Sequence, residues 1–228
     1  ENNMKFTEGY WLLSERTNGQ FASQAYRIEA IENGLRVVAP TSPVLSRGDT
    51  LNRPTITIEF LAVSPEVISV RAWHYEGYRT GEARFEKKET TCDAVVTITE
   101  NEAVLDAGRV SVHVDRKNWG YSFWADGKLL TSSGFHNLGY VRWDRSVSSM
   151  LPQDNYMKEH EYTPYMTQDL LLAPGENVYG FGERFTAFVK NGQVVETWNE
   201  DGGTASQVAY KNIPFYMTNR GYGVFVDH

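Results

Sequence analysis

The stretch TITIEF at residues 55–60 alternates strictly between polar and apolar side chains. Ile56, Ile58 and Phe60 occupy every second position, with threonine or glutamate between them. A strand has a side-chain period of two, so all three apolar side chains fall on one face of an extended chain. β-Branched and aromatic residues also favour strands. The stretch therefore predicts a β-strand with one buried face.

The same period recurs along the chain. It is found in VISVRAWHY (67–75), AVVTIT (94–99) and VSVHVD (110–115). Two dipeptides typical of tight hairpins separate further runs of this kind: Asn33-Gly34 lies between YRIEAIE and LRVVA, and Asp126-Gly127 lies between YSFWA and KLLTS. Short hairpins join neighbouring strands in antiparallel order.

No stretch of a dozen residues keeps an apolar period of 3.6, and strands do not alternate with helices. We therefore expect an all-β protein, an antiparallel β-sandwich with few or no helices. A chain of 228 residues fits one such domain, spanning residues 4–228, with residues 1–3 ahead of Met4 left over from cloning. The region from Gly134 to Thr167 lacks a clear period, and we interpret it as a long surface connection.

Composition narrows the range of partners. The formal net charge is −7 and basic residues do not cluster, which argues against a nucleic-acid partner. The single cysteine, Cys92, cannot form an internal disulfide. No apolar run is long enough to cross a bilayer, and the N-terminus lacks a signal-peptide pattern. These features predict a cytoplasmic protein that binds neither nucleic acid nor membrane.

Two sites are disfavoured by spacing. GFGERF (180–185) lacks the third glycine of a dinucleotide-binding loop, and no helix follows it. The histidines lack the short spacings of zinc ligands. They are His74, His113, His136, His160 and His228. We therefore expect no metal and no cofactor.

The polar loop Trp198–Thr204 lies between two runs that look like strands. It carries carboxylates and an amide, groups that hydrogen-bond sugar hydroxyls, beside a tryptophan on which a sugar ring could stack. The alternative is a flexible hairpin tip, with Glu183 and Arg184 nearby as a structural ion pair. The residues alone leave the two interpretations equal.

Three runs in the last third of the chain resemble one family. They are GFGERF (180–185), ETWN-x-DGGT (196–204) and AYKNIPFYMTNRGYGV (209–224). Their order and composition resemble the N-terminal domain of glycoside hydrolase family 31, most closely that of bacterial α-xylosidases. The resemblance is dense from Tyr179 to Val226 and thin before it.

The resemblance implies a retaining α-glycosidase in which a galactose-mutarotase-like sandwich precedes a (β/α)₈ barrel. The barrel would carry two catalytic aspartates, so this chain would hold no catalytic residue and would be inactive alone. Its partners would be an oligosaccharide substrate and its own downstream barrel, with homo-oligomerisation left open. The chain ends on the strand-like run GYGVFVDH, which fits a piece cut from a longer protein.

The resemblance also implies a pocket-lining role for the polar loop, with Asp201 at the position that touches sugar. Glu200 stands where many relatives have arginine, so the loop is more negative here. The other predicted members are Trp198, Asn199 and Thr204 in the pocket wall, with Glu183 and Arg184 supporting the loop.

Three alternatives remain. A free-standing carbohydrate-binding module would bind sugar unaided through exposed aromatic side chains. A sugar mutarotase would need a general acid and base, often His and Glu, converging in a cleft. An α-glucosidase differs from an α-xylosidase chiefly in barrel residues that this chain lacks.

Overall fold

The computed structural model describes most of the chain. The described residues are 7, 12–15, 17–51, 53–77, 92–144, 162–204 and 207–227. Contacts divide the chain into two compact units, a larger one spanning Phe6–Leu171 and a smaller one that contains Leu172–His228. Residues 1–3, expected to be a cloning remnant, lie outside the described residues.

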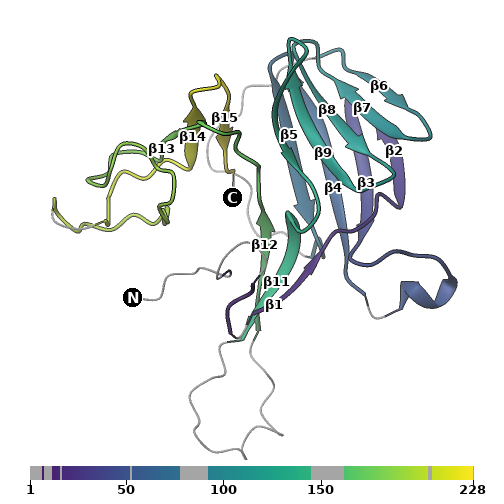
Figure 1. The fold of residues 1–228 in the computed structure, drawn as a ribbon, viewed down its shortest axis with the longest axis horizontal. Coiled ribbons are helices and arrows are strands. Elements are labelled where there is room, and N and C mark those ends of the chain that lie inside the picture. The colour runs from purple at the N-terminus through teal and green to yellow at the C-terminus, as the bar shows by residue number, and fades with distance from the viewer. Residues whose placement is uncertain are drawn as a thin grey trace, which may run out of the picture. The chain divides into compact units, whose positions relative to one another are not determined.

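The larger unit contains three antiparallel sheets among its described residues (Figure 1). The first has the order β2-β3-β4-β5, with bounds Arg27–Ile31, Gly34–Pro40, Thr55–Ser64 and Val67–Trp73. The second has the order β10-β9-β8-β7-β6, and from β6 to β10 the bounds are Val95–Ile98, Glu102–Asp106, Val110–Asp115, Gly120–Ala125 and Lys128–Ser133. The third has the order β1-β11-β12, with bounds Thr17–Phe21, Leu138–Asp144 and Tyr162–Gln168.

The core lies between the four-stranded and the five-stranded sheet, which stack face to face (Figure 1). The alternating residues of TITIEF form the first part of β4, and Ile56, Ile58 and Phe60 are each 0% exposed. The Phe60 ring packs edge-on against two rings of β9, Tyr121 at 5.0 Å and Phe123 at 6.5 Å between centroids. The predicted antiparallel β-sandwich is confirmed, since inward side chains of both sheets interdigitate.

The two predicted hairpins are present, one of them shifted by a residue. Ala125 pairs with Lys128 around Asp126-Gly127, both with positive φ, as predicted. In the other hairpin the loop is Glu32-Asn33, because Gly34 is already part of β3 and pairs with Ile31 of β2. A Cβ on Gly34 would lie 2.2 Å from the Phe60 carbonyl oxygen. Close approach between strands, rather than the turn, requires this glycine.

The expected surface connection from Gly134 to Thr167 is wrong in part, because it contains strands β11 and β12. They pair antiparallel over seven residues, from Leu138↔Gln168 to Asp144↔Tyr162. Glycine and arginine interrupt the alternation in LGYVRWD, yet Leu138 and Val141 are buried. Pairing with β1 and burial therefore form a strand that local pattern did not predict. Residues 145–161 lie outside the described residues.

The smaller unit carries a three-stranded antiparallel sheet and the connection that includes the polar loop. The strands are β13 Val178–Gly180, β14 Phe215–Thr218 and β15 Gly223–Phe225. In the larger unit, a 3₁₀ turn at Arg47–Thr50 is the helical element among the described residues. No helix in the described part of the chain is long and apolar enough to span a membrane.

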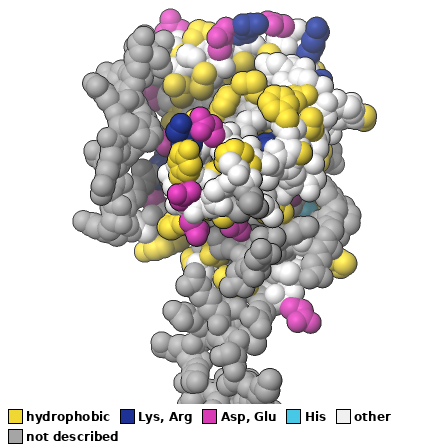
Figure 2. All heavy atoms as spheres, turned by 90° about the vertical axis from the view of Figure 1, so that its left-hand side faces the viewer, with side chains coloured by type: hydrophobic (Ala, Val, Ile, Leu, Met, Phe, Trp, Pro, Cys, Tyr) yellow, Lys and Arg dark blue, Asp and Glu magenta, His cyan; other side chains and the backbone are white. Residues whose placement is uncertain are grey.

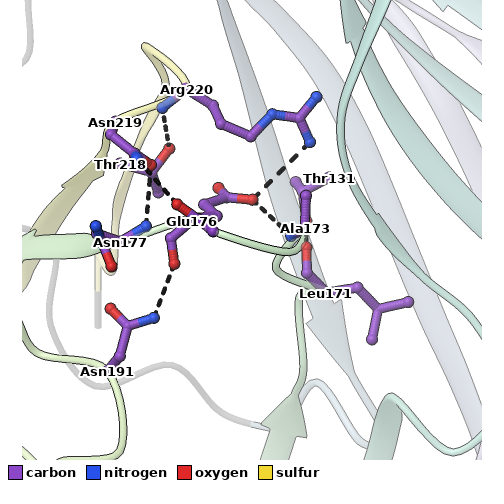
Figure 3. A network of polar contacts seen from close by, with 10 residues as sticks. Thr131, Leu171, Ala173, Glu176, Asn177, Asn191, Thr218, Asn219 and Arg220 are labelled. Carbon is purple, nitrogen blue, oxygen red and sulfur yellow. Dashed lines mark hydrogen bonds and ion pairs between the residues drawn. The ribbon is translucent and has the colours of Figure 1, made fainter.

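Asparagine side chains tie together the turns around β13 (Figure 3). Asn219 accepts the Asn177 N–H at 2.9 Å and donates to the Gly175 carbonyl at 3.1 Å. Asn191 donates to the Glu176 carbonyl at 2.8 Å and accepts the N–H of the first β13 residue at 2.8 Å. These amides satisfy backbone groups that the short sheet leaves without partners.

The Glu176 carboxylate lies at the centre of this network, with a side chain that is 0% exposed. Its Oε2 accepts the Ala173 N–H at 2.8 Å, and Arg220 Nη1 lies 3.9 Å away (Figure 3). Burial raises the pKa of Glu176, but the Tyr222 hydroxyl, the Ala173 N–H, the Thr218 hydroxyl and Arg220 favour the charged form. The net result is a lowered pKa.

Glu176→Gln is expected to lower the free energy of unfolding by about 1 kcal/mol at neutral pH, because a charged acceptor is lost. Since folding lowers the pKa of Glu176, its contribution is complete above the ordinary value of 4.5 and is lost as pH falls through the folded pKa. Urea unfolding between pH 7 and pH 3 should show the two proteins converging on acidification. Glu183→Gln, at a 68% exposed carboxylate, is the matched control. A gap between wild type and Glu176→Gln that stays constant with pH would contradict the charge-based role.

Candidate functional site

Two glycines explain the GFGERF motif without a phosphate. Gly180 and Gly182 have positive φ values of 122° and 84°. A Cβ would lie 2.6 Å from the Phe215 carbonyl oxygen at Gly180, and 2.0 Å from the Lys211 carbonyl oxygen at Gly182. Between them, the Phe181 N–H donates to the Phe215 carbonyl at 2.8 Å. The glycines therefore allow this segment to pack directly against the backbone of residues 211–215.

Arg184 joins three segments of the smaller unit. Its guanidinium donates to the Phe181 carbonyl at 3.2 Å, to the Gln207 carbonyl at 3.2 Å and to the Glu196 carbonyl at 2.5 Å. It also donates to Asn212 Oδ1. Burial lowers the pKa of the guanidinium. Arg184 thus lies at the base of the polar loop, and its partners are oxygen atoms of the backbone and of an amide.

Asn212 continues this network into the loop itself. Its Nδ2 donates to the Trp198 carbonyl at 2.7 Å, to the Ala209 carbonyl at 2.6 Å and to Asn199 Oδ1 at 3.0 Å. Its backbone N–H donates to the same Asn199 oxygen at 3.1 Å. The sequence does not single out Asn212, whose partners are up to 14 positions away. The only feature of the sequence that could have pointed to Asn212 is its place in the run AYKNIPFYM, which resembles the family.

The predicted strand ahead of the loop is not formed. Residues 193–198 have no strand pairing, and an isolated parallel bridge between Asn199 and Ala209 is the only ladder contact that the described residues show here. The Glu200 N–H donates to the Ala209 carbonyl at 3.0 Å. Side chains replace a strand ladder, since Arg184 and Asn212 satisfy the carbonyls that a neighbouring strand would otherwise use.

The tip of the loop is exposed and carries the predicted sugar-contacting groups. Asp201 and Thr204 are both exposed, and Trp198 is 74% exposed. Asp201 Oδ1 accepts the Gly203 N–H at 3.3 Å, the only hydrogen bond to this carboxylate that the described residues show. Gly203 has a positive φ of 63°. The carboxylate and the indole are therefore open to a ligand, while the backbone of residues 198–200, which we call the stem of the loop, is held by hydrogen bonds.

Glu183 does not pair with Arg184 in the structure. Its carboxylate pairs with Lys211 Nζ at 3.2 Å rather than with Arg184. This pair borders a shallow hollow whose empty volume, open solvent included, is about 260 Å³. The hollow is lined by Glu183, Phe185, Gly203, Val208, Ala209, Tyr210 and Lys211. Of the two predicted supporting residues, Arg184 bonds to the carbonyls of Glu196 and Gln207, which flank the loop.

A buried cation, Lys190, lies close to the half-buried Arg184. Lys190 is 6% exposed and donates from Nζ to Thr186 Oγ1 at 3.0 Å and to the Ala187 carbonyl at 2.7 Å. Burial, and then the charge of Arg184, lower the pKa of Lys190. The lysine stabilises the turn at residues 186–190, and its ammonium bonds to neutral oxygens.

The histidines do not build a metal site in the described part of the chain, where no three His, Cys, Asp or Glu side chains gather. His160 and His228 lie outside the described residues. His113 Nδ1 is 3.5 Å from Glu102 Oε2, and its Nε2 is 3.1 Å from Ser111 Oγ. This His–Glu pair lies on strands β7 and β8, with a half-exposed Glu102 side chain. It is not in the hollow beside the polar loop.

Comparison with known proteins agrees with this architecture. The sequence profile of the glycosyl hydrolase 31 N-terminal galactose mutarotase-like domain matches residues 56–228. The chain is 40% identical to the α-xylosidase XylQ of Lactiplantibacillus pentosus, covering 98% of this chain and 27% of that protein. It is 35% identical to an α-xylosidase of Emericella nidulans, covering 99% of this chain and 30% of that protein. The chain thus spans less than a third of the relatives that it matches.

Solved structures share the fold. The cycloalternan-forming enzyme of Listeria monocytogenes superposes with a TM-score of 0.65 at 15% identity, over 92% of this chain and 18% of that one. A family 31 dextranase of Flavobacterium johnsoniae gives a TM-score of 0.57 at 19% identity, over 91% of this chain and 22% of that one. The profile match and the identity to two α-xylosidases show that the chain belongs to glycosyl hydrolase family 31, as its N-terminal galactose mutarotase-like domain.

Proposed function

We propose that this chain is the non-catalytic N-terminal part of a retaining α-glycosidase and that its loop Trp198–Thr204 forms one wall of the substrate pocket. The observation that carries the proposal is the contrast within the loop. Arg184 bonds to the Glu196 carbonyl just before the loop and Asn212 to the Trp198 carbonyl at its start, whereas the side chains of Asp201 and Trp198 are exposed. A carboxylate beside an indole can accept hydrogen bonds from sugar hydroxyls while the ring stacks on the sugar.

The catalytic pair belongs, in this proposal, to a downstream barrel. Retaining hydrolysis needs two carboxyl groups about 5–5.5 Å apart on opposite sides of the scissile bond. Such a pair must be held on rigid elements. Glu200 and Asp201 are neighbours on one irregular segment, so their side chains diverge. The matched α-xylosidases are more than three times as long as the matched region, which leaves ample chain for a barrel in a protein of that kind.

The smaller unit exposes several large apolar side chains, which supports docking onto that barrel. Figure 2 shows hydrophobic side chains among carboxylates on the face turned toward the viewer. Those of the smaller unit at least half exposed are Phe185, Phe188, Trp198, Tyr210, Ile213, Met217, Phe225 and Val226. Exposed apolar surface of this kind can mark an interaction site. The downstream barrel is the partner that we propose for these side chains, except for Trp198, which the proposal assigns to the sugar.

The substrate that we propose is an α-linked xyloside, with an α-glucoside as the alternative. Both relatives named above at 35–40% identity are α-xylosidases, and the match extends over the whole chain. The residues that select xylose over glucose would lie mainly on the barrel. The loop would contribute affinity, with little selectivity between these two sugars.

The 228-residue chain alone is expected to release no product from p-nitrophenyl α-xyloside or α-glucoside, since it lacks the catalytic pair. The positive control, assayed in parallel, is the longer enzyme of this proposal, in which the chain is followed by its catalytic barrel. Turnover by the pure chain that Asp201→Ala abolishes would overturn the proposal.

A titration of the chain with xylo- and gluco-oligosaccharides tests the second candidate function, a free-standing carbohydrate-binding module. Trp198 fluorescence quenched at millimolar sugar, without turnover, would favour a carbohydrate-binding module, a function that the exposed Trp198 and Tyr210 also suit.

A further inference from the structure

The amide of Asn212 has all its hydrogen-bonding groups engaged at the stem of the polar loop. A primary amide offers two N–H donors and one acceptor oxygen. The Asn212 donors face three acceptors, Trp198 O, Ala209 O and Asn199 Oδ1, within 2.6–3.0 Å. Its oxygen accepts from Arg184. One side chain therefore links both sides of the loop to the residue that braces its base.

The side-chain oxygen of Asn199 is engaged within the stem. Its Oδ1 accepts the Asn212 backbone N–H at 3.1 Å and the Asn212 Nδ2–H at 3.0 Å. A carboxamide oxygen has two lone pairs, so this oxygen is fully used. Asn199 was expected in the pocket wall. Its contacts place its oxygen in the stem.

We infer that Asn212 is a positioning residue, which fixes the stem Trp198–Glu200 through the Asn199 side chain and so presents Asp201 to the sugar. The second half of this inference, that Asp201 meets a sugar, rests on the proposed function. The first half, that Asn212 fixes the stem, does not. Glu200, the residue before Asp201, is held by its N–H bond to the Ala209 carbonyl at 3.0 Å. Among the described residues, Asp201 shows one hydrogen bond, from the Gly203 N–H within its own turn. Its location is therefore set by the stem.

A fixed stem matters because productive contacts tolerate little displacement. A site must be held to within about 0.5 Å by surrounding hydrogen bonds and packing. A misplacement of about 1 Å can cost up to a hundredfold in rate. An irregular segment without a strand ladder has few backbone bonds to hold it. The Asn212 amide supplies hydrogen bonds to this segment in place of those from a neighbouring strand.

The first test measures anchoring without activity, by hydrogen exchange in the 228-residue chain. Asn212→Asp is isosteric and keeps an oxygen for Arg184, but it puts a second oxygen opposite the carbonyls of Trp198 and Ala209. The amide of Glu200 should then exchange about tenfold faster, which corresponds to a loss of about 1.4 kcal/mol in local stability. Asn219→Asp is the matched control, because its amide also bridges backbone groups of this unit but does not touch the loop. Equal exchange of Glu200 in both variants would overturn the inference.

The second test uses kcat/KM of the longer enzyme on an aryl α-xyloside. Asn212→Asp is expected to lower kcat/KM about tenfold, whereas Asn219→Asp leaves it unchanged. In the Asp201→Ala background, Asn212→Asp should change kcat/KM less than about twofold, because coupled residues are not additive. Losses that multiply, or no loss from Asn212→Asp, would overturn the positioning role.

The two tests separate this inference from the proposed function. If Asp201→Ala leaves kcat/KM unchanged, the proposed function fails, and the exchange of Glu200 still decides whether Asn212 anchors the stem. If Asp201→Ala lowers kcat/KM but Asn212→Asp does not, only the positioning role fails. Should Asn212→Asp prevent folding, Asn199→Ala removes the shared oxygen from the other side. Unchanged exchange of Glu200 in that variant would overturn the inference.

Discussion

Replacing Phe60 by alanine is expected to lower the free energy of unfolding of the larger unit by about 3–5 kcal/mol. The side chain is 0% exposed and lies between the two large sheets. It packs edge-on against Tyr121 and Phe123 of the opposite sheet. Truncation removes the transfer free energy of the ring and leaves a cavity, because neighbours on two hydrogen-bonded sheets relax only partly.

Urea unfolding monitored by far-UV circular dichroism would measure this loss as a lower midpoint at an unchanged slope. Phe135→Ala is the matched control, since it removes the same atoms from a side chain that is 59% exposed. Its cost should stay below about 1 kcal/mol. Similar midpoints for the two variants would mean that the sheets do not meet at Phe60, and the sandwich as described here would be wrong.

The sandwich could be predicted because its strands obey a local rule. In β4 and β8 the alternation of side chains matches the alternation of buried and partly buried positions, so the sequence predicts which face is inside. The rule fails where burial does not alternate. β11 was missed because Gly139 and Arg142 break its pattern, and only pairing with β1 and β12 makes the segment a strand. Such long-range pairing leaves no local signal.

Less of the site could be predicted, because long-range bonds of side chains, like long-range strand pairing, leave no local pattern in the sequence. Asp201, Trp198 and Thr204 were identified through resemblance to a family, and the structure places all three at or beside an exposed tip. The stem could not be predicted. Asn212 bonds to residues up to 14 positions away through a side chain, and an asparagine in a sequence does not show which carbonyls it will meet. The expected strand before the loop was wrong because these side-chain bonds replace a ladder.

Asp201→Ala in the longer enzyme is expected to reduce kcat/KM on an aryl α-xyloside by roughly ten- to a hundredfold. This range follows from the loss of hydrogen bonds to a charged acceptor, worth about 1.5–3 kcal/mol. Folding should be almost unaffected, because the carboxylate is exposed and, in the part of the chain that the structure describes, accepts one hydrogen bond, from the Gly203 N–H within its own turn. Asp93→Ala removes the same atoms from an exposed position in the larger unit and serves as the control. A melting curve for each protein excludes unfolding as the cause.

The size of the loss distinguishes three roles for the loop. An unchanged kcat/KM would make Trp198–Thr204 a surface hairpin tip and would end the proposed function. A ten- to hundredfold loss fits one wall of a pocket, because one charged contact supplies only a small part of the about 8–23 kcal/mol by which enzymes lower their barriers. A loss of several further orders of magnitude, with an intact fold, would make Asp201 catalytic. The exposed carboxylate, with one hydrogen bond from the described residues, favours the middle outcome, since a nucleophile must be held by surrounding groups, and here the Asn212 amide holds the Trp198 carbonyl in the stem instead.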